Sequence, residues 1–273
     1  MSTERSISSH RTRFVTVALS LLPLLGCPVH EEALPFGLCK LYDAPALDAA
    51  IAKGLNVNAG CCDEHMIGEC SVPRPNSTLL VHAIESKRAD AVRVLLAHGA
   101  DVNAPSSTGL PLGIAISMGQ AEVVEQLLAK GVNDASRDQG LHMAAHAGQV
   151  DAGKRLITMQ PAAQRGAACA LLECSVVPEL VQQGRPELPR QRELLLWAIQ
   201  NCPDPNLKCE GDEHLFTQIA RDDANAPLVE ALLAKGADVN APERNNRTVK
   251  EYLRHFNDYD SRPRIKALLE ATH

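Results

Sequence analysis

One short phrase returns four times along the chain and constrains its fold more than any other feature. It reads GLNVNAG at 54–60, GADVNAP at 99–105, GVNDA at 131–135 and GADVNAP at 236–242. Such self-similarity is typical of repeat architectures, in which a length of 273 residues does not translate into a number of globular domains. The chain is therefore expected to fold as an array of similar units.

An apolar helical run precedes the phrase in the clearest units. Apolar residues recur three and four positions apart in AVRVLLAHG, EVVEQLLAKG and LVEALLAKG, which end at residues 99, 131 and 236. A shorter helix is expected before each second helix, at 78–88, 111–119, 141–148 and 215–223. Two helices and a turn therefore make the unit.

This pattern resembles the ankyrin repeat, which has a period of about 33 residues and the first-helix motif T-P-L-H-x-A. Gly99 and Gly236 stand where a second helix ends and a positive φ is needed. The resemblance implies that Asp101-Val102-Asn103 and Asp238-Val239-Asn240 start an outward β-hairpin, and that small residues let the helices pack closely: Ala83, Ala115 and Ala144. The implied fold class is all-α, an ankyrin-repeat solenoid of six to seven helix-turn-helix units with short β-hairpin fingers.

The predicted array covers residues 27–273, and its units differ in quality. The best units lie at 76–105, 106–135 and 207–241. A first unit is expected at 31–60, with helices LPFGLCKLYD and PALDAAIAKG, and a closing unit at 243–273, with helices NRTVKEYLRHF and RPRIKALLEA. Two departures interrupt the pattern, an insertion loop at 61–75 and degenerate repeats at 161–206.

The N-terminal segment reads as an export signal. Basic residues precede the apolar run Phe14 to Leu25, which is too short for a membrane-spanning helix, and Gly26-Cys27 follows. Leu24-Leu25-Gly26-Cys27 resembles the lipobox of bacterial lipoproteins. We therefore expect residues 1–26 to be a signal peptide, Cys27 to be the cleavage and lipidation site, and the chain to reside in the periplasm of a Gram-negative bacterium, with or without a lipid anchor.

Export changes the interpretation of the cysteines, because thiols pair in oxidising compartments. Eight remain as disulfide candidates once Cys27 is set aside, and eight cysteines allow 105 pairings: Cys39, Cys61, Cys62, Cys70, Cys169, Cys174, Cys202 and Cys209. Cys202 and Cys209 flank the turn PDPN and are the preferred pair. Zinc is the competing hypothesis for His65 with its neighbouring thiols, but the regular ligand spacing of zinc sites is missing, so neither a metal nor a cofactor is expected.

The resemblance implies a protein that binds other proteins through its hairpin tips and the concave face of its first helices. The residues expected at these positions are Asp63, Glu64, His65, Glu85, Ser106, Ser107, Ser117, Met118, Arg137, Asp138, His146, Glu210, Asp212, Arg221, Asp222, Glu243, Arg244 and Asn245. Several are acidic, which favours a partner with a basic patch. The net charge of −6 argues against nucleic acid, and the protein is expected to be a monomer.

Catalysis is not expected, because motifs for nucleophilic serine, zinc peptidase and phosphate-binding chemistry are absent from the sequence. A hydrolytic enzyme and a thiol-redox role for Cys61-Cys62 remain alternatives, although the reactive C-x-x-C arrangement is missing. Exported bacterial ankyrin proteins suggest two roles. One is an immunity protein that inhibits a secreted toxic effector, such as a lipase, and the other is an envelope stress accessory that supports a catalase-like enzyme.

Overall fold

The computed structural model describes residues 33–34, 43–61, 77–180, 188–209, 213–243, 247–255 and 259–272. The predicted signal peptide and Cys27 lie outside these residues, as do Cys39, Cys62, Cys70 and most of the predicted insertion loop. The side chain of Cys61 is not described either.

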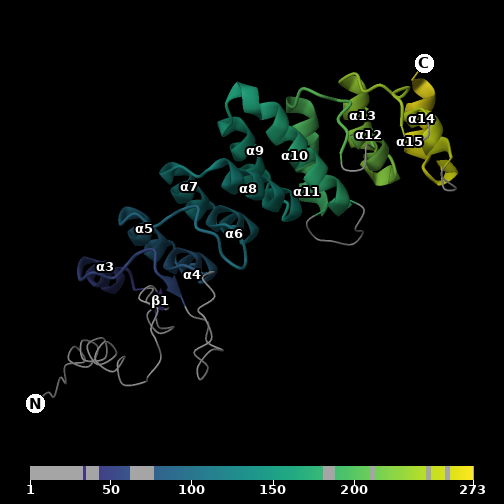
Figure 1. The fold of residues 1–273 in the computed structure, drawn as a ribbon. Coiled ribbons are helices and arrows are strands. Elements are labelled where there is room, and N and C mark those ends of the chain that lie inside the picture. Colours follow the sequence, from purple (N-terminus) through teal and green to yellow (C-terminus); the bar gives the residue numbers. More distant parts are fainter. Residues whose placement is uncertain are drawn as a thin grey trace, which may run out of the picture.

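Helices arranged in pairs make up nearly all of the described chain (Figure 1). One helix, α3 (Ala44–Ala52), precedes six pairs: α4 (Leu79–Glu85) and α5 (Ala89–Ala97), α6 (Pro111–Ser117) and α7 (Ala121–Lys130), α8 (Asp134–His146) and α9 (Val150–Met159), α10 (Ala162–Leu180) and α11 (Leu188–Asn201), α12 (Leu215–Ile219) and α13 (Ala226–Ala234), and α14 (Val249–Arg254) and α15 (Pro263–Ala271). The 3-10 helix η3 (Asp223–Asn225) leads into α13, and η5 (Tyr259–Ser261) precedes α15.

Equivalent helices of successive pairs stack side by side and form two layers. The inner layer contains α4, α6, α8, α10, α12 and α14, and the outer layer contains α3, α5, α7, α9, α11, α13 and α15. Figure 1 shows the result as an elongated array with the N-terminal pairs at one end and α15 at the other. The expected solenoid is therefore confirmed.

Two short strands accompany the first unit. β1 (Ala33–Leu34) pairs in parallel with β2 (Gly60–Cys61), with Ala33 opposite Gly60. The prediction of a helix beginning at Leu34 is therefore wrong at its first residue, because the backbone of Leu34 is used in this pairing. The second predicted helix of the unit is present as α3, and both helices of the closing unit are present as α14 and α15.

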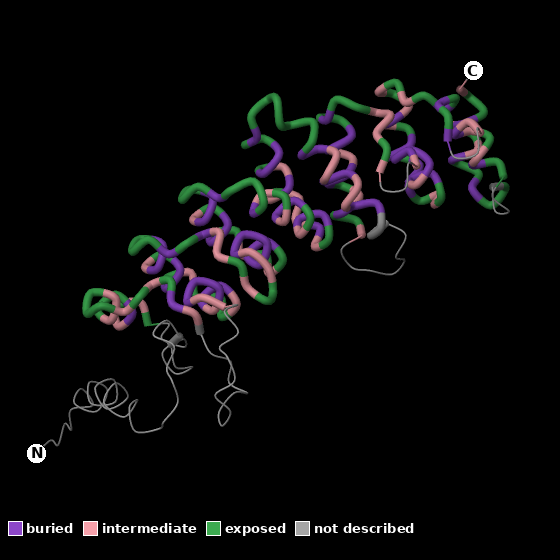
Figure 2. Tube along the Cα trace, viewed as in Figure 1, coloured by how far each residue is buried: buried purple, intermediate pink, exposed green. Residues whose placement is uncertain are grey.

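The core is a thin layer between the helices and follows the array from end to end (Figure 2). Ala83, Ala115 and Ala144 occupy equivalent positions on α4, α6 and α8, and at most 1% of each is exposed. Leucine, isoleucine and valine fill the space around them. Since small alanines bring neighbouring helices close together, little room is left for large rings, which explains why only 3% of the chain is aromatic.

Asparagine side chains join the turns of successive units. The Oδ1 atom of Asn58 accepts a hydrogen bond from the backbone N–H of Asp101, at 2.8 Å. Asn103 accepts in the same way from Asn133, at 2.9 Å, and Asn206 from Asp238, at 2.7 Å. These asparagines belong to the recurring phrase or to its degenerate form PDPN. The phrase therefore recurs along the chain because its asparagine connects one unit to the next.

Glycine ends the second helices as expected, with φ of 84° at Gly99 and 93° at Gly236. Short fingers follow some of these turns, where Ser106 bridges Gly109, Lys208 bridges His214 and Pro242 bridges Thr248. Fingers are thus present after α5, α11 and α13, and a fourth bridge joins Gly60 to Thr78 between α3 and α4.

The finger predicted to contain Arg137 and Asp138 does not exist, and both residues lie in α8. Asn133 caps this helix, since its Oδ1 accepts from the N–H of Ser136 at 2.8 Å, and the Ser136 hydroxyl donates to Asn103 Oδ1 at 2.7 Å. Asn103 and Asn133 are only 30 positions apart, whereas Asn206 and Asn240 are 34 apart. The shorter unit replaces its finger with the first turns of α8.

Two disulfides clamp the chain that follows α11 to helix α10. They join Cys169 to Cys202 and Cys174 to Cys209, with Cα separations of 5.8 and 5.4 Å. The predicted pair Cys202–Cys209 is therefore wrong. Each bonded pair is 33 or 35 residues apart, close to one repeat period, and equivalent positions of neighbouring units lie side by side in a solenoid.

Both disulfides are expected to stabilise the degenerate part of the array. Each closes a loop of more than thirty residues, so C169A/C202A and C174A/C209A should each lower the free energy of unfolding by about 3–4 kcal/mol. Urea denaturation of the oxidised proteins measures the loss, and peptide mapping without reductant identifies the pairs. A peptide containing the Cys202–Cys209 bond would contradict the pairing described above.

Two glycines within helices provide a matched test of packing. A Cβ atom added at Gly153 of α9 would lie 2.9 Å from Leu194 Cδ1, and Leu194 is fully buried on α11. At Gly166 of α10 the nearest atom is Pro203 Cγ, at 4.0 Å. Thermal denaturation should therefore show that G153A destabilises the fold by about 1–3 kcal/mol, whereas G166A stabilises it by about 0.5–1 kcal/mol. Equal effects of the two changes would contradict close packing between α9 and α11.

Candidate binding surface

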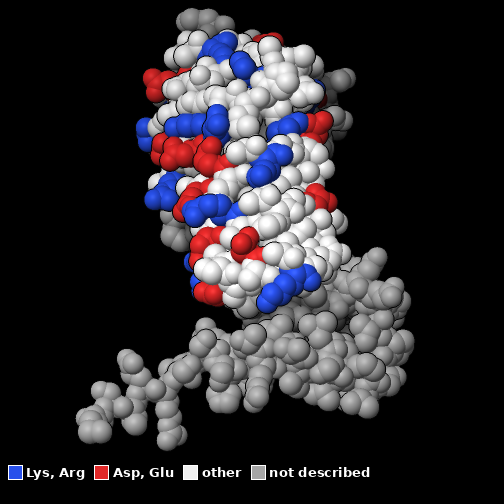
Figure 3. Space-filling model, turned by 90° about the vertical axis from the view of Figure 1, so that its left-hand side faces the viewer, with Lys and Arg blue, Asp and Glu red and all other residues white. Residues whose placement is uncertain are grey.

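Charged side chains of the outer layer are paired between units. Arg93 of α5 contacts Glu122 of α7 at 2.7 Å, and Glu125 of α7 contacts Arg155 of α9 at 3.4 Å. Lys154 of α9 lies 3.6 Å from Glu193 of α11. Figure 3 shows acidic and basic side chains alternating on one side of the molecule, next to a broad uncharged area. Exposed pairs of this kind add little stability, but they leave the outer face nearly neutral.

The inner face is defined here as the exposed side of the inner helices, and its charged groups include the exposed carboxylates of Asp134 and Asp138 in the first turns of α8. Its accessible polar side chains in the described part of the chain include His82, Ser117, His142, His146, Ser175 and Gln218. Glu85, at the end of α4, is half-buried and accepts a hydrogen bond from the Thr108 hydroxyl at 2.9 Å. This face therefore presents hydroxyl, imidazole and amide groups together with the two carboxylates of α8.

His142 has a defined orientation on this face. Its Nδ1 lies 3.2 Å from the hydroxyl oxygen of Ser175 on the neighbouring α10. That hydroxyl donates its own hydrogen to the carbonyl of Leu171 at 2.6 Å, so it can only accept from His142. Nδ1 must therefore carry a proton, and in the neutral ring Nε2 is left as an acceptor for a ligand or water. His142 stands at the histidine position of the first-helix motif, and its exposed ring also presents a hydrogen-bonding nitrogen on this face.

Several of the predicted binding residues are accessible. Ser107, Ser117, His146 and Arg221 are exposed, and Ser106 is half-buried in the finger after α5. Met118 is also half-buried and packs against the core, so only part of its side chain is available. Seven further residues lie outside the described parts of the chain: Asp63, Glu64, His65, Glu210, Asp212, Arg244 and Asn245.

Two predicted binding residues have structural roles instead. Glu243 is only 7% exposed, and its Oε1 accepts from the backbone N–H of His214 at 3.0 Å and from the Thr217 hydroxyl at 2.5 Å. Asp222 caps η3 through the N–H of Ala224 and lies 3.4 Å from Arg192 of α11. The prediction that Glu243 is an exposed tip is wrong, because this carboxylate holds the finger after α13 against α12.

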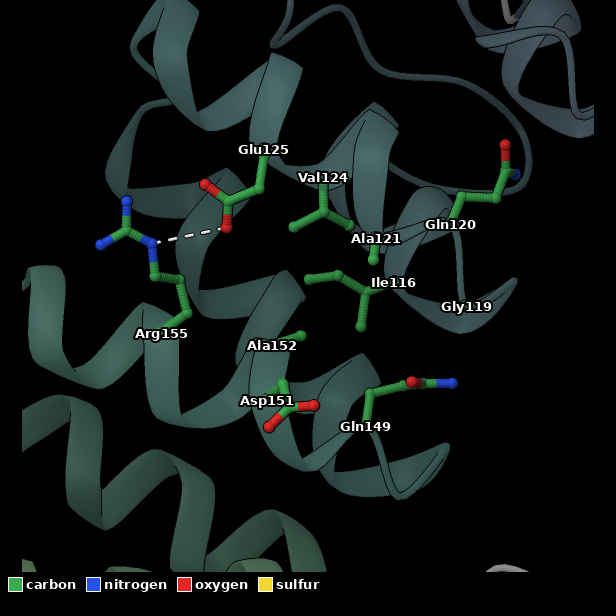
Figure 4. A pocket seen from close by; sticks show the side chains of 10 residues that line it. All are labelled: Ile116, Gly119, Gln120, Ala121, Val124, Glu125, Gln149, Asp151, Ala152 and Arg155. Atoms are coloured by element: carbon green, nitrogen blue, oxygen red, sulfur yellow. Dashed lines mark ion pairs between the residues drawn. The ribbon is translucent and has the colours of Figure 1, made fainter.

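A shallow pocket of about 160 Å³ opens where α7 and α9 separate (Figure 4). Ile116, Val124 and Ala152 face its apolar centre from three helices, and the Glu125–Arg155 ion pair lies at its edge. The neighbouring outer helices α5 and α7, and α9 and α11, are in closer contact. The pocket is thus a gap in the stacking, with one ion pair at its edge and Asp151 as a second carboxylate in its lining.

A second pocket, of about 230 Å³, lies between α10 and the loop that follows α11, and is called the α10 pocket below. The Cys169–Cys202 disulfide, Asp204 and Leu207 line it together with Glu173. Glu173 is only 2% exposed, and burial raises the pKa of its carboxyl to about 8. The negative charge of Asp204 raises this pKa further, and the ammonium of Lys235 opposes both effects. Glu173 is therefore a neutral acid at pH 7.

Sequence reasoning missed Glu173, although its spacing carried a signal. Cys169, Leu172, Glu173 and Val176 occur at positions i, i+3, i+4 and i+7 of α10, and all four are buried. A carboxylate among apolar residues on the core side of a helix is unusual enough to mark a candidate site.

Within the described residues, no group of three or more His, Cys, Asp and Glu side chains is placed to hold a metal ion. The helices described there also include none with the length and apolar character needed to cross a membrane.

Comparison with known proteins identifies the fold. The family described as "Ankyrin repeats (3 copies)" matches residues 46–138, which run from α3 to the start of α8. No relative was found among curated proteins. The structure is similar to the human ASB11 ankyrin repeat domain, with 16% identity and a TM-score of 0.59 over 87% of this chain and 98% of that one.

A bacterial structure is similar over most of the chain as well. The ankyrin repeat domain ABAYE2397 from Acinetobacter baumannii AYE shares 20% identity and a TM-score of 0.54, over 74% of this chain and 99% of that one. The ankyrin repeat domain of Bcl-3, a member of the IkappaB protein family, shares 16% identity and a TM-score of 0.55, over 76% and 86%. The chain folds as an ankyrin-repeat solenoid.

The buried acid of the α10 pocket should make stability depend on pH. Folded Glu173 keeps its proton up to about pH 8, while the unfolded chain releases it near the ordinary value of 4.5. Unfolding therefore releases a proton between these values, and this contribution to the free energy of unfolding falls as the pH rises through that window. The free energy of unfolding of the wild type minus that of E173Q, both measured by urea denaturation, should fall by a few kcal/mol between about pH 4.5 and 8. A difference independent of pH would contradict the burial of an ionisable Glu173.

Proposed function

We propose that this ankyrin-repeat solenoid is a non-catalytic binding protein of the bacterial cell envelope, which holds a partner protein against its inner face and fingers. Ankyrin repeats are in general protein-protein interaction modules. The observation that carries the proposal is the contrast between the two faces. Several charged groups of the outer face are paired between units, whereas the inner face offers accessible groups such as Ser117, Asp138 and His146.

The chemistry of the inner face favours a particular kind of contact. Its hydroxyl, imidazole and amide groups suit hydrogen bonds and close packing, and the exposed Asp134 and Asp138 of α8 can also pair with basic groups. The exposed carboxylates of Asp134 and Asp138 favour a partner with a basic patch, whereas Glu243 is buried, and the predicted acidic residues Asp63, Glu64, Glu210 and Asp212 lie outside the described residues. We therefore expect association to weaken as the salt concentration rises.

Two disulfides support the proposed compartment, because such bonds persist in oxidising environments and are rare in the bacterial cytosol. The N-terminal segment ending at Cys27 supports export by a signal peptide and attachment through a lipid. Recovery from the envelope fraction with both disulfides formed would agree with this proposal. Recovery from the cytosol with free thiols would contradict it.

An immunity protein that blocks a secreted toxic effector is the preferred biological role. A rigid, disulfide-clamped binder in the envelope would meet an effector where it arrives. Deletion of the gene should then cause toxicity only when the cognate effector is delivered. The alternative, an accessory of a catalase-like enzyme, instead predicts that deletion sensitises cells to peroxide without any effector.

Two hydroxyl residues on opposite faces test where the partner binds. Ser117 ends α6 on the inner face, and its hydroxyl donates to the Ile114 carbonyl at 2.8 Å. Thr158 near the end of α9 makes the equivalent bond to Arg155, at 3.0 Å, on the outer face. Both are exposed, so arginine at either position should leave the fold intact. S117R should weaken capture of the partner from envelope extract at least about tenfold, and T158R should not.

Quantitative pull-down at two salt concentrations makes this comparison, with circular dichroism as a check on folding. Equal binding by both variants would place the partner elsewhere. Turnover of a substrate by a chain that retains no stoichiometric partner would contradict the proposed function as a whole.

A further inference from the structure

The α10 pocket contains a buried acid that no internal contact explains. Glu173 makes no hydrogen bond to any of the described residues, although 98% of its surface is removed from solvent and it lines the pocket. The carboxyl therefore meets the space of the pocket, and a largely desolvated polar group without a partner destabilises the folded state. A glutamine, leucine or methionine would fill the same space at lower cost, so the carboxyl needs a reason outside the folding of the chain.

We propose that the α10 pocket binds a small organic cation, an ammonium or guanidinium group, in exchange for the proton of Glu173. This inference goes beyond the proposed function and does not depend on it. The cation is either a free small molecule or the end of a lysine or arginine side chain, since both present the same chemistry to the pocket.

Charge balance supports a single positive charge. Three ionisable groups influence one another here: Glu173 on α10, Asp204 in the loop after α11, and Lys235 at the end of α13. With Glu173 protonated, Asp204 and Lys235 cancel. With Glu173 ionised, two carboxylates face one ammonium, and the excess is one negative charge. One monovalent cation restores neutrality at the moment when one proton leaves.

Lys235 does not supply that cation itself. Its Nζ donates to the carbonyl of Ile199 at 2.6 Å and to the carbonyl of Cys202. These contacts hold the ammonium at the end of α11, and Lys235 is not among the residues that line the pocket. Glu173 remains without a donor of its own, even though the charge of Lys235 reaches it.

The size and the walls of the pocket select the ligand further. Its volume of about 230 Å³ is smaller than the sites that hold drug-sized molecules, and it suits a single head group with a short apolar stem. Ala170 and Leu207 provide apolar contacts for such a stem. A divalent metal such as Ca²⁺ would need six to eight oxygen ligands, whereas the pocket offers two carboxyl groups.

The disulfides hold this arrangement in place. Cys169 and Cys174 lie four residues before and one residue after Glu173 on α10, and each is bonded to the chain on the opposite wall. The two walls therefore cannot separate when the carboxyl ionises. A binding site that is fixed in advance loses less entropy when it captures its ligand.

The exchange is balanced without any further reactant. The O–H bond of the Glu173 carboxyl breaks and its proton passes to solvent buffer. The N–H groups of the cation then donate hydrogen bonds to the carboxylate that remains, and the net charge of the pocket does not change. Binding is consequently expected to release one proton at pH 7 and to strengthen as the pH rises toward 8.

Isothermal titration calorimetry of the full chain tests the exchange with a matched pair of ligands. Nα-acetyl-arginine amide carries the guanidinium, and Nα-acetyl-citrulline amide is its neutral isostere. Titrations at pH 7 in two buffers with different heats of ionisation yield the affinity and the number of protons released. The arginine derivative should bind with release of about one proton, and the citrulline derivative should bind at least about tenfold more weakly.

Variants of single carboxyl groups complete the test. E173Q keeps the shape of the side chain but has no proton to give, so proton release should disappear and affinity should fall about tenfold or more. E125Q on the outer face is the matched control and should bind like the wild type. Equal binding of both ligands, unchanged binding and proton release by E173Q, or no binding of the arginine derivative to the folded wild type would each overturn the proposal.

A further ligand distinguishes the two sources of the cation. Methylguanidinium presents the head group without a peptide backbone. If it binds as tightly as the arginine derivative, the pocket recognises a free small cation. If the arginine derivative binds much more tightly, the pocket receives a side chain of another protein. Because no partner protein is present, failure here leaves the proposed function standing, and failure of the pull-down leaves the cation site standing.

Discussion

Stacking between neighbouring units is the interaction on which the whole structure depends. A single helix pair exposes too much of its apolar surface to be stable alone, and only contact with the next pair buries it. The described core accordingly runs without a break from Leu47 on α3 to Leu269 on α15. The asparagine side chains that bond from turn to turn set the spacing of this stack. The fingers and both pockets are local changes within single units, and each unit must still pack against its neighbours.

The adjustment is largest around α10, where the repeat pattern is weakest and both disulfides occur. Ala162 to Ala167, the first turns of this helix, are exposed, so that they contribute little to the core. The disulfides replace part of that missing cohesion by restricting the unfolded chain. Their stabilising effect also offsets the destabilisation caused by burying Glu173 without a partner. Stability and the proposed cation site are thus linked through the same pair of bonds.

Regularity decides how much of the structure could be predicted from the sequence. Helix pairs, the glycine turns and the buried alanines follow from a repeating pattern, and the structure confirms them. Local deviations were harder, because each depends on a neighbour in space. The finger expected at Arg137 is replaced by helix, since Ser136 and Asn133 bond to the preceding turn. Glu243 was assigned to an exposed tip, but it folds inward to accept hydrogen bonds from Thr217 and His214.

The disulfide pairs and Glu173 could have been recognised from spacing alone. Cys202 and Cys209 are close in sequence, but Cys169 and Cys174 are one period away from them, which is the separation that brings residues together in a solenoid. Glu173 occupies a position that the helical pattern assigns to the core. The identity of a partner could not be predicted in this way, because the complementary chemistry resides in another molecule.

Native-state hydrogen exchange, with and without a reductant, tests most directly the claim that stacking carries the array and that disulfides compensate for its weakest unit. In the oxidised protein, amides of α10 and α11 should be protected to nearly the same degree as those of α6 and α8. After reduction, protection should fall first and most in α10 and α11, while α4 to α8 remain protected. Uniform loss across all helices, or no change in α10 and α11, would contradict this account.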